Sequence, residues 1–240
     1  MKIFYVSSVL IAMTLVSCQE DNSFFNELTP IRAYDTDTRI MAQFVEVDKT
    51  TGTYVLNPDK KITASDYVIN KSREELMEVS QINKDRFLRE MEEVNNQLSV
   101  VKRSGLTSSF IYSTQTADVV IDGDEDDSFI LSRRIEEPYT RNRLASLILS
   151  EGERKSTNFF SQSDMVMTVS AGNTSAFYCA QVTLGDQNDE DAEIIYISGV
   201  KSFISEHSYR LVSPSIVDSN ETISGMTIIG TGNISVSISR

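Results

Sequence analysis

The chain has little of the chemistry on which most enzymes depend. Its 240 residues include one histidine, His207, and two cysteines, Cys18 and Cys179. A serine triad or a cysteine–histidine pair would have to recruit His207, and we expect that histidine in a surface turn. The Gly-x-Ser-x-Gly elbow, the His-Glu-x-x-His motif, the phosphate loop and the glycine-rich dinucleotide motif are also absent. The sequence therefore predicts no catalytic residue and no cofactor, although its 35 acidic residues leave a glycosidase-like carboxylate pair open.

Tryptophan is absent, and basic residues are outnumbered by acidic ones. The chain has 22 Lys and Arg against 35 Asp and Glu, a net charge of -13. A surface of this sign repels nucleic-acid phosphates, so we expect no nucleic-acid partner. Without tryptophan, sugar stacking would fall to tyrosines, of which the candidates are Tyr54, Tyr112, Tyr178, Tyr196 and Tyr209.

The first 18 residues combine a basic start with an apolar run that ends at a cysteine. Lys2 precedes Ile3–Val16, a run of 14 residues, whereas a membrane-spanning helix needs about 20. We therefore interpret the segment as a cleaved export signal. Leu15-Val16-Ser17-Cys18 resembles the lipobox of bacterial lipoproteins. The resemblance implies that Cys18 becomes the first mature residue and carries acyl chains on its thiol and its amine, which together anchor it stably in a membrane.

The residues directly after Cys18 bear on where the mature protein faces. Gln19-Glu20-Asp21-Asn22 resembles the acidic export tag of surface lipoproteins of the Bacteroidetes type, and the alternative is a solvated spacer. The resemblance implies a cell-envelope protein, lipid-anchored to the outer membrane and, if the tag is genuine, exposed at the cell surface. Removing residues 1–18 takes away Lys2 and no acid, so the net charge changes from -13 to -14. We divide the chain into a signal peptide (1–17), a lipidated cysteine with its tether (18–36) and a single domain (37–240).

The first half of the domain predicts a hairpin and one long helix. Arg39–Val47 and Thr53–Leu56 read as strands joined by a polar loop that ends in glycine. A helix is predicted from Ser72, which forms a capping box with Glu75, to Arg103. Its apolar stripe would pack on the protein's own sheet, with a coiled-coil face as the alternative. The stripe and the glycine placed to end the helix are Leu76, Val79, Phe87, Met91, Val94, Leu98, Val101 and Gly105.

The second half reads mainly as short strands separated by polar turns. One further helix is predicted from Glu137 to Ser150, with Leu144, Leu147 and Ile148 on one face. The expected class is α+β, with a long amphipathic helix packed on an antiparallel β-sheet or sandwich. The predicted strands are Phe110–Tyr112, Ala117–Ile121, Phe129–Leu131, Met165–Val169, Ala176–Leu184, Ile194–Ser198, Tyr209–Val212, Thr222–Ile229 and Ile234–Ile238.

Two loops are rich in acid, and one of them resembles the start of a calcium loop. Asp122, Asp124 and Asp126 place carboxylates at every second position, as a hard cation would require. An EF-hand would then need glycine at Asp127 and glutamate at Arg133, so the match fails. We interpret this loop, like residues 186–193, as a solvated turn and predict no metal. Cys179 lies in an apolar run, where we expect a small core residue.

These features favour a non-catalytic binding or adhesion module whose ligand is a protein or a glycan. The alternatives are an envelope hydrolase that uses a carboxylate pair, and a structural or pilus-like subunit that donates the strand Ile234–Ile238. For the binding module we expect tyrosines clustered on one face of the loops.

Overall fold

The computed structural model describes residues 32–61, 66–105, 109–115, 118–122, 128–131, 143–150, 153–160, 165–185, 192–201, 206–211, 223–229 and 232–239, within a compact unit from Arg32 to Arg240. These residues form three helices and thirteen strands, which confirms the α+β class. The helices are α1 (Tyr34–Ala42), α2 (Asp66–Met77) and α3 (Gln81–Ser104).

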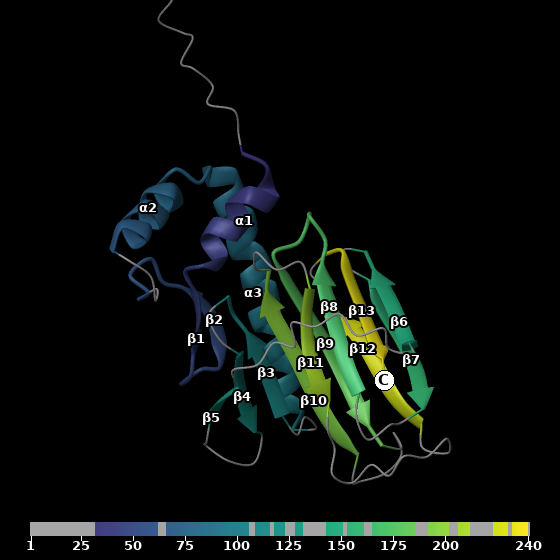
Figure 1. Ribbon diagram of the computed structural model, residues 1–240. Helices are drawn as coiled ribbons and strands as arrows, with labels where there is room; N and C mark the ends of the chain where they lie inside the picture. Colours follow the sequence, from purple (N-terminus) through teal and green to yellow (C-terminus); the bar gives the residue numbers. More distant parts are fainter. Residues whose placement is uncertain are drawn as a thin grey trace, which may run out of the picture. The chain divides into compact units, whose positions relative to one another are not determined.

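The strands form a hairpin and two larger sheets (Figure 1). In the hairpin, β1 (Val45–Asp48) pairs with β2 (Thr53–Leu56), as the polar loop between them predicts. The seven-stranded sheet has the order β5-β4-β3-β10-β9-β12-β7 and is mixed, because β3 and β10 run parallel. The four-stranded sheet has the order β11-β8-β13-β6 and is antiparallel. The strand bounds are β3 (Ser109–Ser113), β4 (Asp118–Asp122), β5 (Ser128–Leu131), β6 (Arg143–Leu149), β7 (Arg154–Phe160), β8 (Met165–Ala171), β9 (Phe177–Leu184), β10 (Glu193–Val200), β11 (Glu206–Leu211), β12 (Ile223–Ile229) and β13 (Ile234–Ser239).

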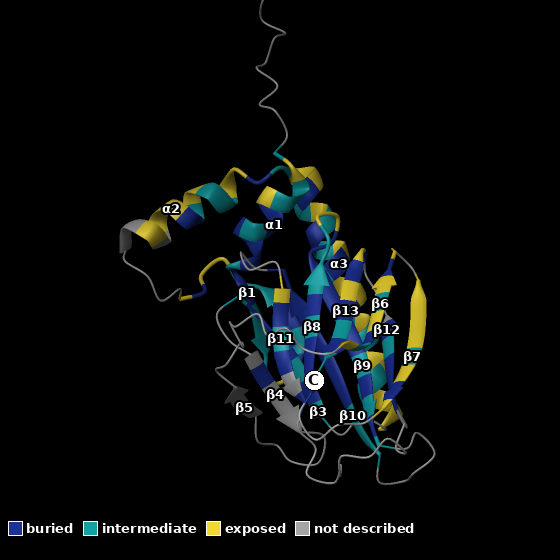
Figure 2. Ribbon diagram, turned by 45° about the vertical axis from the view of Figure 1, so that its right-hand side comes forward, coloured by how far each residue is buried: buried dark blue, intermediate teal, exposed yellow. Residues whose placement is uncertain are grey.

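The seven-stranded sheet lies between two hydrophobic cores. On one face it packs against the helices and the hairpin, with Phe87 of α3 and Phe177 of β9 in this helix-side core. On the other face it packs against the four-stranded sheet, with Tyr178 of β9 and Val236 of β13 in this sandwich core. The central strand β9, which lies between the two cores, is mostly buried, whereas the edge strand β7 is mostly exposed (Figure 2).

The position of β9 explains its almost unbroken apolar sequence. Phe177 and Cys179 face the helix-side core, while Tyr178 and Ala180 face the sandwich core. A strand that is buried on both faces needs apolar residues at every position, not at every second one. Cys179 is fully buried there, which confirms its prediction as a core residue.

The single helix expected from Ser72 to Arg103 is not confirmed, because the chain leaves the helical conformation between α2 and α3. Ser72 is buried inside α2 and does not begin a helix. The capping residue is Ser80, whose backbone is extended and whose side chain accepts a hydrogen bond from the Asn83 amide at 3.3 Å. Asp37 of α1 fixes this break, since its Oδ2 accepts from Asn83 Nδ2 at 2.8 Å.

The apolar stripe of this region packs in the helix-side core as expected, although two helices and the bend between them carry it. Gly105 adopts a left-handed conformation with φ of 66° and ends α3, as predicted. The stripe therefore packs within the domain, and its members in the helix-side core are Leu76, Val79, Phe87, Met91, Val94, Leu98 and Val101.

The prediction of a helix from Glu137 to Ser150 is wrong over its described part, where residues 143–149 form β6. Leu144, Leu147 and Ile148 have helical spacing, but Ile148 is 69% exposed. The alternation of Ala145, Leu147 and Leu149 decides the outcome, because these residues oppose the buried face of β13. The start of the predicted helix lies outside the described residues.

Two further segments differ from the sequence-based expectation. The chain is helical from Tyr34 to Ala42, so Arg39–Ala42 belongs to α1 and not to a strand, and α1 begins inside the expected tether. Ile40, Met41 and Ala42 are all buried, and three consecutive apolar residues that pack against α2 and α3 suit a helix better than an alternating strand. The strand β7 was not predicted, since its sequence is mostly polar.

Candidate recognition site on helix α3

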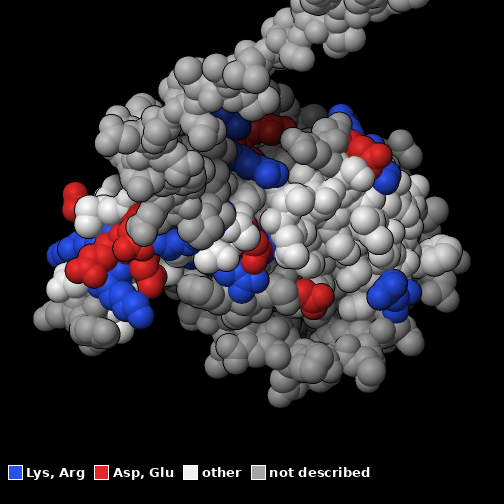
Figure 3. Space-filling model, turned by 90° about the horizontal axis from the view of Figure 1, so that it is seen from above, with Lys and Arg blue, Asp and Glu red and all other residues white. Residues whose placement is uncertain are grey.

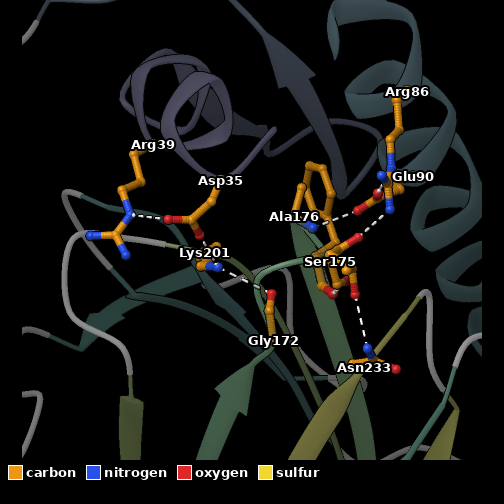
Figure 4. A network of polar contacts seen from close by, with 11 residues as sticks. Asp35, Arg39, Arg86, Glu90, Gly172, Ser175, Ala176, Lys201 and Asn233 are labelled. Carbon is orange, nitrogen blue, oxygen red and sulfur yellow. Dashed lines mark hydrogen bonds and ion pairs between the residues drawn. The ribbon is translucent and has the colours of Figure 1, made fainter. Parts of the chain in front are cut away.

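The first half of α3 is tied to the sheet by a buried carboxylate, that of Glu90. Its side chain accepts hydrogen bonds from Tyr34 Oη at 2.8 Å, from Arg86 Nε at 3.2 Å and from the amide of Ala176, directly before β9. Burial raises the pKa of Glu90 and outweighs these donors, which act to lower it. One carboxylate thus holds α1, α3 and the sheet together, and Figure 4 shows its contacts with Arg86 and Ala176.

A second network joins α1 to the residues directly after β8 and β10 (Figure 4). The ammonium of Lys201 is buried and donates to Asp35 and to the carbonyl of Gly172, the latter at 3.1 Å. Arg39 Nε also donates to Asp35, at 3.2 Å. Burial opposes ionisation of Asp35, but Lys201 and Arg39 together hold its pKa below the usual range. Both networks position α1 and α3 relative to residues 172–176.

The second half of α3 is held on two opposite flanks by side-chain amides. Asn95 Oδ1 accepts from the Tyr54 amide at 2.8 Å, and Asn95 Nδ2 donates to the Tyr54 carbonyl at 2.9 Å. Two residues further on, Gln97 Oε1 accepts from Cys179 Sγ at 3.0 Å and from Tyr196 Oη at 3.5 Å. Residues two apart on an α-helix point in nearly opposite directions. Asn95 therefore binds the hairpin, and Gln97 binds the sheet.

A groove of about 590 Å³ runs along the Gln97 flank of α3. Its described lining comes from one face of the helix, at spacings of three and four residues, and we call it the α3 groove. Val100 is 60% exposed at its apolar end. The volume lies within the range of small-ligand sites. The residues of the α3 groove are Arg89, Glu92, Glu93, Asn96, Gln97, Val100 and Val101.

The thiol of Cys179 and the imidazole of His207 lie inside the two cores. Burial raises the pKa of Cys179 to about 12, which leaves the thiol protonated. His207 lies on β11 and is 3% exposed, so the prediction of a surface turn is wrong. Its Nδ1 contacts Tyr178 Oη, which also lies 2.6 Å from Tyr209 Oη. The histidine thus completes a polar cluster that joins the two sheets.

The tyrosines considered for sugar stacking are buried, so the expectation of tyrosines on one loop face is wrong for these residues. Tyr178 and Tyr209 belong to the sandwich core, and the others belong to the helix-side core. The calcium candidates are not tested: Asp124 and Asp126 lie outside the described residues, and only the backbone of Asp122, at the end of β4, is described. Cys18 also lies outside the described residues. No cluster of three acidic, histidine or cysteine side chains that could hold a metal occurs among the residues described.

Among the residues coloured in Figure 3, acidic and basic side chains lie intermixed, and no large patch of one sign is seen on this face. Within the described part of the chain, no helix combines the length and the apolar sequence needed to cross a membrane.

No family model, no curated protein and no solved structure matches the chain. The candidate site therefore stands on its own geometry.

The α3 groove was not predicted from the sequence. The apolar stripe leaves Arg89, Glu92 and Asn96 on the polar face of the predicted helix, and these residues do line the groove. No local sequence pattern identifies Gln97, because its role depends on Cys179 and Tyr196, which are distant in the sequence.

Proposed function

We propose that this protein is a non-catalytic binding module of the cell envelope, anchored in the outer membrane through acylated Cys18, and that the α3 groove is its recognition site. The lipobox supports the anchor. The observation that carries the recognition role is the groove itself, in which an exposed valine and exposed polar side chains lie on a helix that is rigidly held at Glu90, Asn95 and Gln97. Preorganised side chains on a rigid element favour binding, because they lose little conformational entropy when the ligand binds.

The positions of the thiol and the imidazole support binding over catalysis. Cys179 is protonated and buried beneath Gln97, and His207 is enclosed between the sheets. A nucleophile or a general base has to reach its substrate. The donor-strand alternative receives no support from β13, which pairs with β8 on one edge and with β6 on the other.

The anchor is tested by the substitution Cys18→Ala. We expect the wild-type protein to fractionate with membranes and the variant to be released, since two or more acyl chains supply the anchoring energy. Unchanged membrane association of the variant would refute the lipid anchor. Protease shaving of whole cells then tests the outward orientation, and resistance of the mature domain would contradict it.

The recognition role is tested by screening the lipidated protein in detergent against an array that carries both peptides and glycans. Val100→Asp places a charge at the apolar end of the α3 groove, and Val68→Asp is the matched control, because Val68 is 46% exposed on α2 and does not line the groove. We expect specific ligands to lose at least about tenfold in affinity with Val100→Asp and to be unaffected by Val68→Asp. An array without any ligand sensitive to Val100→Asp would overturn the assignment of the groove.

A further inference from the structure

The α3 groove is graded along its length. Charged residues lie at its N-terminal end, two carboxamides follow, and two valines close the C-terminal end. Glu92 and Val100 are eight residues apart, which corresponds to about 12 Å along a helix at 1.5 Å per residue. A ligand that fills the groove therefore meets different chemistry at its two ends.

The charged end favours a cation. Among the described lining residues of this end, Glu92 and Glu93 are acidic and Arg89 is basic, so acidic side chains outnumber the basic one. Glu92 makes no hydrogen bond or ion pair with any described residue, and its carboxylate is free to bind a ligand. A lysine or arginine side chain satisfies this end, and the opposite charge of Arg89 suits a carboxylate or carbonyl further along the same ligand.

The centre of the groove offers a fixed hydrogen-bond donor. Cys179 and Tyr196 hold the carbonyl oxygen of Gln97 on the sheet side, at 3.0 Å and 3.5 Å. Because a carboxamide is planar, this contact also sets the direction of the NH₂ group of Gln97. No described residue accepts a hydrogen bond from that group. A donor held in this way favours a carbonyl acceptor.

The described lining of the α3 groove favours a polypeptide over a glycan. None of the described groove residues is aromatic, and sugar stacking depends on aromatic faces. A polypeptide supplies a carbonyl at every residue, together with charged and apolar side chains. In an extended strand, residues four apart lie on the same face about 13 Å apart, which matches the span from Glu92 to Val100.

We propose that the α3 groove binds an extended segment of a partner protein that carries a lysine or arginine four residues from an aliphatic side chain. The cation binds Glu92, a backbone carbonyl accepts from Gln97, and the aliphatic side chain contacts Val100 and Val101. This specificity rests on the proposed recognition function of the groove.

The test uses synthetic ten-residue peptides rich in serine and threonine, with affinities for the lipidated protein measured by fluorescence anisotropy. We expect a peptide with Lys and Leu four residues apart to bind with a Kd below about 1 mM, and a peptide with Glu in place of Lys to bind at least about tenfold more weakly. Moving Leu by one residue, to the opposite face of the strand, should cause a similar loss. Absence of binding by the Lys and Leu peptide at about 1 mM overturns the proposal.

Two variants establish where the peptide binds. Glu92→Lys should reverse the preference between the Lys and Glu peptides, and this exposed substitution leaves the core untouched. Gln97→Leu should weaken binding of the Lys and Leu peptide more than Asn96→Leu does, because Asn96 lacks the contacts that orient Gln97. An unchanged preference with Glu92→Lys overturns the proposal.

The outcomes separate this inference from the proposed function. Ligands that are sensitive to Val100→Asp but are glycans, or peptides without the cation, would leave the recognition role standing and overturn the specificity. A dimer of the protein in sedimentation that is lost with Val100→Asp would make a second copy of the chain the occupant, which also overturns it. If no ligand is sensitive to Val100→Asp, the recognition role itself fails.

Discussion

Gly199 of β10 lies directly opposite Tyr178 of β9, and the tyrosine ring occupies the space where a side chain at position 199 would be. A Cβ atom built on Gly199 would lie 2.1 Å from Tyr178 Oη and 2.2 Å from its Cζ. The phenol cannot move aside freely, since it contacts His207 and Tyr209 in the sandwich core. The missing side chain of Gly199 is therefore what allows this polar cluster to form.

Substituting Gly199→Ala should destabilise the protein by about 1–3 kcal/mol, because the added methyl group overpacks a filled core. Urea unfolding measures the change. The control is Gly105→Asn, which meets open space and carries only the strain of a left-handed backbone, so it should cost less than Gly199→Ala. A Gly199→Ala variant as stable as wild type would mean that Tyr178 is not packed against the glycine.

Substituting Asn95→Ala should cost about 1–3 kcal/mol of unfolding free energy, because the amide and the carbonyl of Tyr54 both lose a partner. Asn96→Ala is the matched control, since this exposed neighbour gains the same helix propensity without losing those bonds. The difference between the two variants isolates the contact with β2. Equal stabilities would show that Asn95 does not hold the hairpin.

The stability of the protein should depend on pH through Glu90. Burial raises the folded-state pKa of Glu90 above its ordinary value of 4.5, so the folded protein retains this proton to higher pH than the unfolded chain. The contribution is therefore complete below pH 4.5 and decreases as the pH rises through the folded-state pKa. Wild type should lose stability relative to Glu90→Gln as the pH rises above 4.5. Urea unfolding of both proteins at several pH values measures this gap, and a gap that grows in favour of wild type would show that the carboxylate is the favoured form.

The thiol of Cys179 should resist alkylation in the folded protein. With a pKa of about 12 and no exposed surface, it is neither ionised nor accessible at pH 8. We expect iodoacetamide to label it only as the protein unfolds in urea, in a Cys18→Ser background. Val100→Cys supplies an exposed thiol as the positive control. Rapid labelling of Cys179 in the native state would contradict its burial.

The parts of the fold that were predicted correctly depend on local patterns. Ile234, Val236 and Ile238 alternate with serines, and β13 buries them on one face. Gly105 ends α3, and the loop that closes at Gly52 joins β1 to β2. Each of these features is decided within a few residues, so the sequence is sufficient to reveal it.

The errors in the predicted secondary structure have two causes: local patterns that coincide, and partners that are distant in the sequence. Residues 144–149 satisfy both a helical and an alternating reading, and pairing with β13 selects the strand. The helix break at Ser80 was missed, because the residue that reinforces it, Asp37, lies 46 positions before Asn83. A distant partner leaves no periodic signal in the segment that it reshapes.

The sequence by itself determined the secondary-structure class, the apolar stripe of α2 and α3, the strand β9 and the expectation of a lipid anchor at Cys18. These follow from composition and spacing, which act over short distances along the chain. The tertiary structure alone decided the candidate site. Glu90 meets Ala176 across 86 residues, and Gln97 meets Cys179 across 82. Such contacts form only when α3 packs on the sheet, because burial, and not local propensity, selects which polar groups come together.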